Sequence, residues 1–152
     1  MRAAVLHGSR DLRFEQVTDP APKPDEALVR IAANGICGSD LHFYDRGRLG
    51  PVVVARPYIP GHEAGGVGVE PARNGSGPKR GARVAGEPGV PCRRCALCRS
   101  GRYNLCRDVV FLSAPPVNGT FAELAAVASD FLHPLSDRLS DAVHGGSPVD
   151  GA

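Results

Sequence analysis

A chain of 152 residues, 42% of them apolar, is long enough to fold as one domain around its own core. Its formal net charge of +2 is too small to favour nucleic acid or an anionic membrane as a partner. The chain has no run of about 18 apolar residues and its start is too quickly polar for a signal peptide, so we expect a cytoplasmic protein without a membrane span.

Short strands dominate the predicted secondary structure, because 19 glycines and 14 prolines favour many turns over long helices. The predicted elements, in chain order, are hairpin strands over residues 1–7 and 10–17 with a turn at Gly8 and Ser9, a half-buried strand over 26–33, a short helix from an N-cap at Ser39 to Tyr44, and strands over 64–70, 82–85, 119–128 and 131–135. From residue 136 the apolar pattern fades, so we predict a disordered tail over residues 136–152.

Residues 87–107 interrupt this pattern with four cysteines, five arginines and few apolar residues. Such a segment cannot build a core, so something else must order it. Cys92, Cys95, Cys98 and Cys106 have the spacing C-x2-C-x2-C-x7-C, which suits a tetrahedral zinc ion with four thiolate ligands. Four sulfurs leave no open coordination position, so the spacing predicts a structural zinc site.

Three other interpretations of this segment stay open. Four buried free cysteines would need apolar neighbours, of which the segment has few. An iron–sulfur cluster is typical of runs with a shorter last gap and a following proline, whereas here Arg107 follows a gap of seven residues. A nucleic-acid-binding zinc ribbon is favoured by the arginines, but it usually has two CxxC pairs set well apart.

Cys37 is the one cysteine outside this segment, and it lies beside a predicted helix start, which favours a thiolate. His62 and Glu63 follow a Pro-Gly bend, which would allow two adjacent side chains to approach one ion. A thiolate, an imidazole and a carboxylate, together with water, would form an open zinc site of catalytic type. Asp40 could then accept the second imidazole N–H of His62. On spacing alone, ordinary packed residues remain the alternative.

Three motifs resemble those of one enzyme family, in the same order. Residues 35–42 (GICGSDLH) resemble the first zinc motif of the medium-chain zinc-dependent alcohol dehydrogenases, and residues 60–63 (PGHE) resemble the second. The four-cysteine run resembles the structural zinc lobe of that family. Its flanks at 86–92 and 101–106 resemble the polyol branch, which includes sorbitol and xylitol dehydrogenases.

The resemblance implies a mainly β fold, namely a GroES-like, partly open barrel with short helices over residues 1–135 and a zinc-binding lobe at 87–107. It implies that Cys37, His62 and Glu63 bind a catalytic zinc ion. The residues that it implies for a structural zinc ion are Cys92, Cys95, Cys98 and Cys106.

Other residues take roles from the same resemblance. Ser39 is implied as the hydroxyl that relays the alcohol proton, and Glu63 as a carboxylate that takes part at the catalytic zinc. Asp40 would support this zinc site through His62. Phe43 and Phe111 are implied as aromatic residues of the substrate pocket, with ordinary core packing as the alternative.

The sequence departs from the family in its last part. It contains no G-x-G-x-x-G fingerprint and no Glu-Pro motif after residue 135, so it looks truncated and predicts no cofactor-binding residues. We expect the zinc-binding part of an NAD- or NADP-dependent dehydrogenase that, when complete, oxidises a secondary alcohol of a small polyol. Whether this chain alone is an enzyme stays open. A non-catalytic zinc-binding remnant is one alternative, and an interaction module, such as a GroES-like oligomer or a nucleic-acid-binding lobe, is another.

Overall fold

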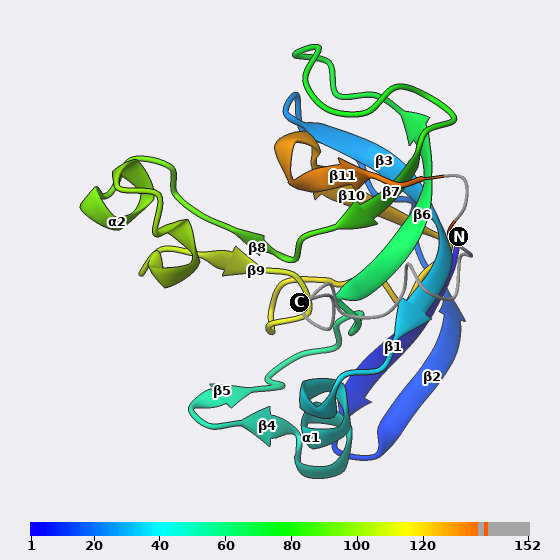
Figure 1. Cartoon of the computed structure of the whole chain (residues 1–152). Helices are drawn as coiled ribbons and strands as arrows, with labels where there is room; N and C mark the ends of the chain where they lie inside the picture. The colour runs from blue at the N-terminus through cyan, green and yellow to red at the C-terminus, as the bar shows by residue number, and fades with distance from the viewer. Residues whose placement is uncertain (137–138, 140–152) are drawn as a thin grey trace.

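The computed structural model describes residues 1–136 and residue 139, which form a mainly β molecule with short helices (Figure 1). The strands are β1 (Arg2–Gly8), β2 (Asp11–Gln16), β3 (Glu26–Gly35), β4 (Arg48–Leu49), β5 (Val52–Val53), β6 (Glu63–Glu70), β7 (Arg83–Gly86), β8 (Gly89–Val90), β9 (Val110–Phe111), β10 (Leu124–Ala128) and β11 (Leu132–Pro134). The helices are α1 (Gly38–Arg46) and α2 (Ala96–Arg99), with 3-10 turns η1 (Tyr103–Leu105) and η2 (Ser129–Phe131). Most of the predicted tail over residues 136–152 lies outside the described residues.

The predicted N-terminal hairpin is confirmed as the antiparallel pair β1 and β2. Gly8 pairs with Asp11, so the turn lies one residue later than predicted. Ser9 and Arg10 form this turn, and Arg10 has a left-handed φ of 60°. The Arg10 amide donates a hydrogen bond of 2.6 Å to the Tyr44 carbonyl in α1. A contact with a distant helix thus stabilises the turn, and local sequence does not reveal such a contact.

Five antiparallel strands form the main sheet in the order β10-β3-β6-β7-β11. Figure 1 shows β3 and β6 as long, bent strands, so that the sheet curls into a partly open barrel. The register of β3 on β6 shifts after Leu28 and again after Ile31, and such bulges bend a strand. The predicted mainly β, partly open barrel with short helices is confirmed.

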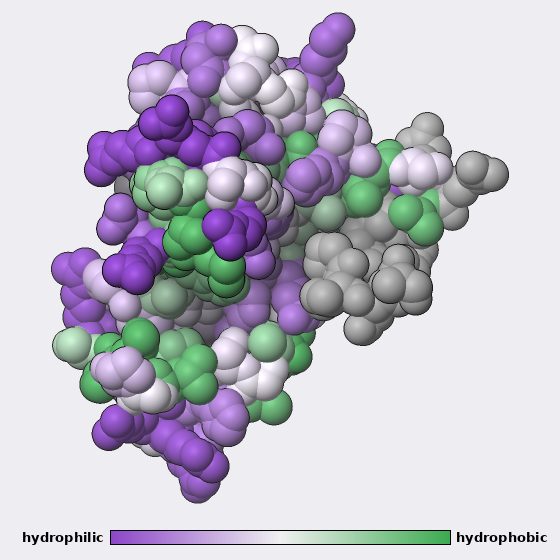
Figure 2. All heavy atoms as spheres, turned by 60° about the vertical axis from the view of Figure 1, so that its left-hand side comes forward, coloured by the Kyte–Doolittle hydropathy of each residue, from purple (hydrophilic) through white to green (hydrophobic). Residues whose placement is uncertain are grey.

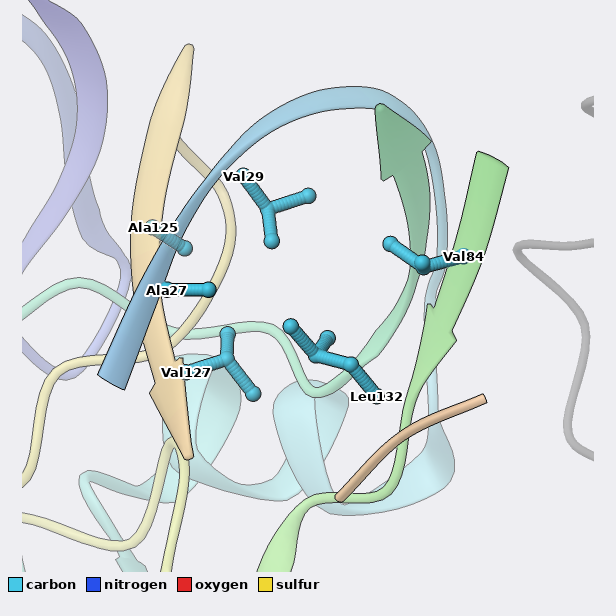
Figure 3. Packing of buried hydrophobic residues seen from close by; sticks show 6 residues of the cluster. All are labelled: Ala27, Val29, Val84, Ala125, Val127 and Leu132. Atoms are coloured by element: carbon cyan, nitrogen blue, oxygen red, sulfur yellow. The ribbon is translucent and has the colours of Figure 1, made fainter. Parts of the chain in front are cut away.

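Small apolar side chains fill the barrel from four of these strands (Figure 3). Alternate residues of β3 and β10 point inward, as successive residues of a strand must point to opposite faces. They meet one side chain each from β7 and β11. The buried set is Ala27, Val29, Val84, Ala125, Val127 and Leu132. The prediction of a half-buried strand over residues 26–33 is confirmed, because Ala27 and Val29 belong to this core.

Helix α1 begins next to the end of β3, and its predicted cap is wrong. Cys37, not Ser39, is the N-cap residue, and the helix ends at Arg46 rather than Tyr44. The Asp40 carboxylate accepts a hydrogen bond of 3.0 Å from the Cys37 amide. This hydrogen bond joins the first turn of the helix to its N-cap residue and stabilises the helix start. The prediction had given this capping role to Ser39.

Two pairs of very short strands were not predicted. The strands β4 and β5 pair after α1, and β8 and β9 pair at the base of the cysteine-rich segment. Each has two residues, too few for an alternating pattern. None of the helices among residues 1–136 and 139 has the length and apolar character needed to cross a bilayer.

Candidate metal centres

The four-cysteine lobe (residues 91–109) leaves the barrel at β8, returns at β9 and projects away from it in Figure 1. Its four sulfurs lie within 4.8 Å of one another. Cys95 Sγ is 3.4 Å from Cys98 Sγ and 4.0 Å from Cys106 Sγ. Four sulfurs bound at about 2.3 Å to a tetrahedral ion stand about 3.8 Å apart. The arrangement of the thiols therefore fits such an ion.

Backbone amides of the lobe point at the sulfurs. The Cys92 amide donates to Cys106 Sγ at 3.3 Å, and the Cys95 amide donates to Cys92 Sγ at 3.4 Å. Hydrogen bonds from the amides of Arg94 and Cys95 lower the pKa of the Cys92 thiol to about 6. Burial and the neighbouring thiols raise the pKa of Cys98 to about 12. Negative charges on sulfurs this close together would repel one another. A bound cation would offset this repulsion.

The lobe is attached to one corner of the barrel by a small set of contacts. The Arg93 guanidinium donates to both carboxylate oxygens of Asp130, at 2.6 and 3.0 Å. It also lies 5.5 Å from the centroid of the Phe131 ring. Tyr103 packs edge to face on the same ring, with 5.9 Å between centroids. Contacts of this kind contribute about 1 kcal/mol each. Most of the stability of the lobe must therefore come from interactions inside the lobe itself.

The second candidate centre lies where the ends of β3 and β6 meet. Gly35 pairs with Glu63 across these strands, which places Cys37 near the start of β6. The structure brings the ligand atoms of Cys37, His62 and Glu63 within 4.8 Å of one another. We call these residues the Cys-His-Glu cluster. A thiolate, an imidazole and a carboxylate could hold a divalent ion and leave one coordination position for a substrate oxygen.

Asp40 is hydrogen-bonded to both loops of this cluster, and the residue is only 5% exposed. Its Oδ2 accepts from the Cys37 amide at 3.0 Å, and its Oδ1 accepts from the Gly61 amide at 3.2 Å. Ser113, which was not predicted at the site, donates its hydroxyl to Oδ1 at 3.2 Å. His62 Nδ1 lies 3.8 Å from Oδ1 and makes no hydrogen bond. Two backbone amides and one hydroxyl donate to Asp40 here, while its predicted hydrogen bond from the His62 imidazole stays a prediction.

Apolar side chains flank the cluster. His62 is 9% exposed, and its ring packs edge to face on Phe111 with 5.4 Å between centroids. Ile36, the residue before Cys37, is 69% exposed. Figure 2, which turns the lobe side of the molecule forward, shows hydrophobic residues gathered between hydrophilic ones. Part of the apolar surface beside the cluster is thus open to solvent in this chain.

The remaining predicted site residues lie in different places. Phe43 is buried against Tyr58 and Leu6, with 6.1 Å between the two aromatic centroids. It packs in the core between α1 and β1, which is the arrangement of the core-packing alternative; the substrate-pocket role stays a prediction. Ser39 lies half-buried in the first turn of α1, two residues after Cys37.

Comparisons with known proteins give a consistent result. A family model described as the alcohol dehydrogenase GroES-like domain matches residues 23–137. A sorbitol dehydrogenase of Bacillus subtilis (strain 168) is 48% identical over 143 residues, which are 92% of this chain and 40% of that protein. A protein of Neosartorya fischeri named "Probable D-xylulose reductase A" is 42% identical over 137 residues, or 90% of this chain and 38% of that protein.

The fold is also found among solved structures. Galactitol-1-phosphate dehydrogenase from Escherichia coli superposes with a TM-score of 0.85 at 27% identity. The match covers 95% of this chain and 41% of that one. The chain therefore spans about 40% of the length of the relatives that it matches, and nearly all of it falls inside the matched region.

Proposed function

Because the chain belongs to the alcohol dehydrogenase GroES-like domain family, we propose that it is the zinc-binding part of a cytoplasmic polyol dehydrogenase that uses NAD or NADP. The complete enzyme oxidises a secondary alcohol of a small polyol to a ketone. The convergence of Cys37, His62 and Glu63 at the junction of β3 and β6 is the observation that carries this proposal. Relatives named for sorbitol and D-xylulose support the polyol class.

Each residue of the cluster has a role in this proposal. Cys37, His62 and Glu63 hold a zinc ion through a sulfur, a nitrogen and an oxygen atom. Zinc bound there supplies Lewis acidity, which lowers the pKa of an alcohol and polarises a carbonyl group. Ser39 accepts the alcohol proton and passes it on toward solvent. Phe111, packed on His62, presents an apolar face to the carbon chain of the substrate.

The four-cysteine lobe has a different role in the proposal. Its four sulfurs close the coordination shell, so the zinc ion that they hold is structural. The 152 residues contain no G-x-G-x-x-G fingerprint. The proposal therefore assigns no nicotinamide-binding residue to residues 1–152.

Cobalt titration tests the Cys-His-Glu cluster directly. With zinc already in the lobe, we expect one further Co²⁺ to bind per chain and to give visible absorption with a thiolate charge-transfer band. His62→Ala removes one of three ligands. We expect it to weaken this binding by more than about 100-fold, the upper end for residues that only support a ligand.

His42→Ala is the matched control for that titration, because His42 is an exposed histidine of α1, five residues from Cys37. It should bind Co²⁺ as the unaltered chain does. If His62→Ala kept the spectrum and the stoichiometry, the cluster would not be the metal site and the proposed function would lose its main support.

A second expected result concerns turnover by a protein made of residues 1–152 alone. We expect no reduction of NAD or NADP with sorbitol, xylitol or simple alcohols, measured as absorbance at the nicotinamide band. Much of the rate of hydride transfer comes from holding the nicotinamide carbon about 3–3.5 Å from the substrate carbon, and the sequence of residues 1–152 contains no G-x-G-x-x-G fingerprint to hold the cofactor. Zinc-dependent reduction that disappeared in Cys37→Ala would contradict this expectation.

A further inference from the structure

Ser113 occupies an unusual position for a serine. It is 3% exposed, and its φ of 69° lies in the left-handed region, where a residue with a side chain is strained. Backbone geometry alone would favour glycine here. Its hydroxyl donates a hydrogen bond of 3.2 Å to Asp40 Oδ1. Glycine would suit this backbone better but would lack the hydroxyl group that bonds to Asp40.

The partner of that hydroxyl is a buried carboxylate with few donors. Asp40 Oδ2 accepts from the Cys37 amide, and Oδ1 accepts from the Gly61 amide and from Ser113. A buried charge depends strongly on each of its hydrogen bonds, because water does not replace a lost one. The Ser113 hydroxyl therefore sets the position of the same oxygen that binds the loop before His62.

Ser113 also ties a third segment of the chain to the cluster. It lies 73 positions after Asp40 and two residues after Phe111, whose ring packs on His62. Through Asp40, this hydroxyl links the segment that carries Phe111 to the Cys37 loop and to the loop before His62.

We propose that Ser113 is a positioning residue for metal binding by Cys37, His62 and Glu63, and that it acts through Asp40. The inference rests on the proposed function, because it needs a metal ion at the Cys-His-Glu cluster. Ser113 does not touch the ion. It holds the Asp40 carboxylate where both ligand loops are bonded to it, so that the ligand atoms are already close together before an ion arrives.

Two variants separate the hydroxyl from the backbone. Ser113→Gly removes the hydroxyl and suits a φ of 69°, whereas Ser113→Ala removes the hydroxyl and keeps the strain. With zinc in the lobe, Co²⁺ titration should show affinity at the cluster reduced by about 10- to 100-fold in both variants. The visible Co²⁺ spectrum should also shift, because the ligand geometry changes. Thermal melting of Ser113→Gly should stay close to that of the unaltered chain.

Ser129→Ala is the matched control, because Ser129 is also a buried serine whose hydroxyl bonds another side chain, that of Ser76. It should change melting but leave Co²⁺ affinity and spectrum unaltered. Unaltered Co²⁺ binding by Ser113→Gly would overturn the inference and leave the proposed function standing. Unfolding of both Ser113 variants would assign the residue to folding and overturn the inference as well. Failure of the unaltered chain to bind Co²⁺ beside its lobe zinc would overturn both proposals.

Discussion

Cys98→Ser is expected to release zinc from the four-cysteine lobe and to unfold the lobe while the barrel stays folded. The 3-10 turn η1 and helix α2 contain no buried residue, so apolar packing cannot hold them. Binding of structural zinc at small cysteine sites is worth about 10–16 kcal/mol, and this free energy is folding free energy. Loss of one of four ligands should therefore remove the main source of order between β8 and β9.

Zinc content and proteolysis measure this result together. The unaltered chain should retain about one zinc ion after mild chelation, and Cys98→Ser should lose it. Trypsin should then cleave rapidly after exposed arginines of the lobe, such as Arg94, Arg99 and Arg102. Cys37→Ser is the matched control, since it alters the one cysteine outside the lobe and should keep the chelation-resistant zinc. Purified protein containing iron and sulfide in place of zinc would refute the assignment.

Gly61→Ala is expected to destabilise the barrel strongly, by about 3 kcal/mol or more. Gly61 has a φ of 91°, and a Cβ there would fall on the ring of Phe121. Its amide donates to Asp40, so the backbone cannot move away without breaking a buried hydrogen bond. Backbone strain, overlap of the new Cβ with the Phe121 ring and a weakened hydrogen bond to Asp40 would therefore combine at this residue. It immediately precedes His62.

Thermal melting measures this cost, with Gly81→Ala as the matched control. Gly81 has a φ of 83° but free space where a Cβ would lie. It should cost only the strain of a left-handed alanine, about 1–2 kcal/mol. The melting temperature should fall by about 2–4 °C for each kcal/mol, so the Gly61 variant should melt clearly below the Gly81 variant. Equal melting of the two variants would mean that the Phe121 ring moves away at no cost.

The long elements of the fold could be predicted because their patterns extend over many residues. The alternation in β3 and the hairpin of β1 and β2 are of this kind. The β8–β9 pair could not be predicted, because two-residue strands have no period and their pairing depends on the lobe between them. The cap of α1 was placed on Ser39 by residue preference, whereas the Asp40 side chain stabilises a start at Cys37.

The candidate centres were predictable to the extent that their chemistry is local. The cysteine spacing and the His62-Glu63 pair are visible in the chain itself, and the structure places both sets close together. The surroundings of the ligands were not predictable. Ser113 reaches Asp40 across 73 positions, and Phe43 lies in the core because α1 turns it toward Tyr58. Contacts between distant segments leave no periodic signal in a single sequence.

The short β8–β9 pair also bears on how such a chain can evolve. Val90 lies opposite Val110 in this pair, so the two ends of the four-cysteine lobe are adjacent. A segment with adjacent ends can be gained, lengthened or lost without moving the strands on either side. The entropic cost of closing it grows only with the logarithm of its length. The sequences of the barrel and of the lobe can therefore diverge at different rates under selection, although one gene encodes both.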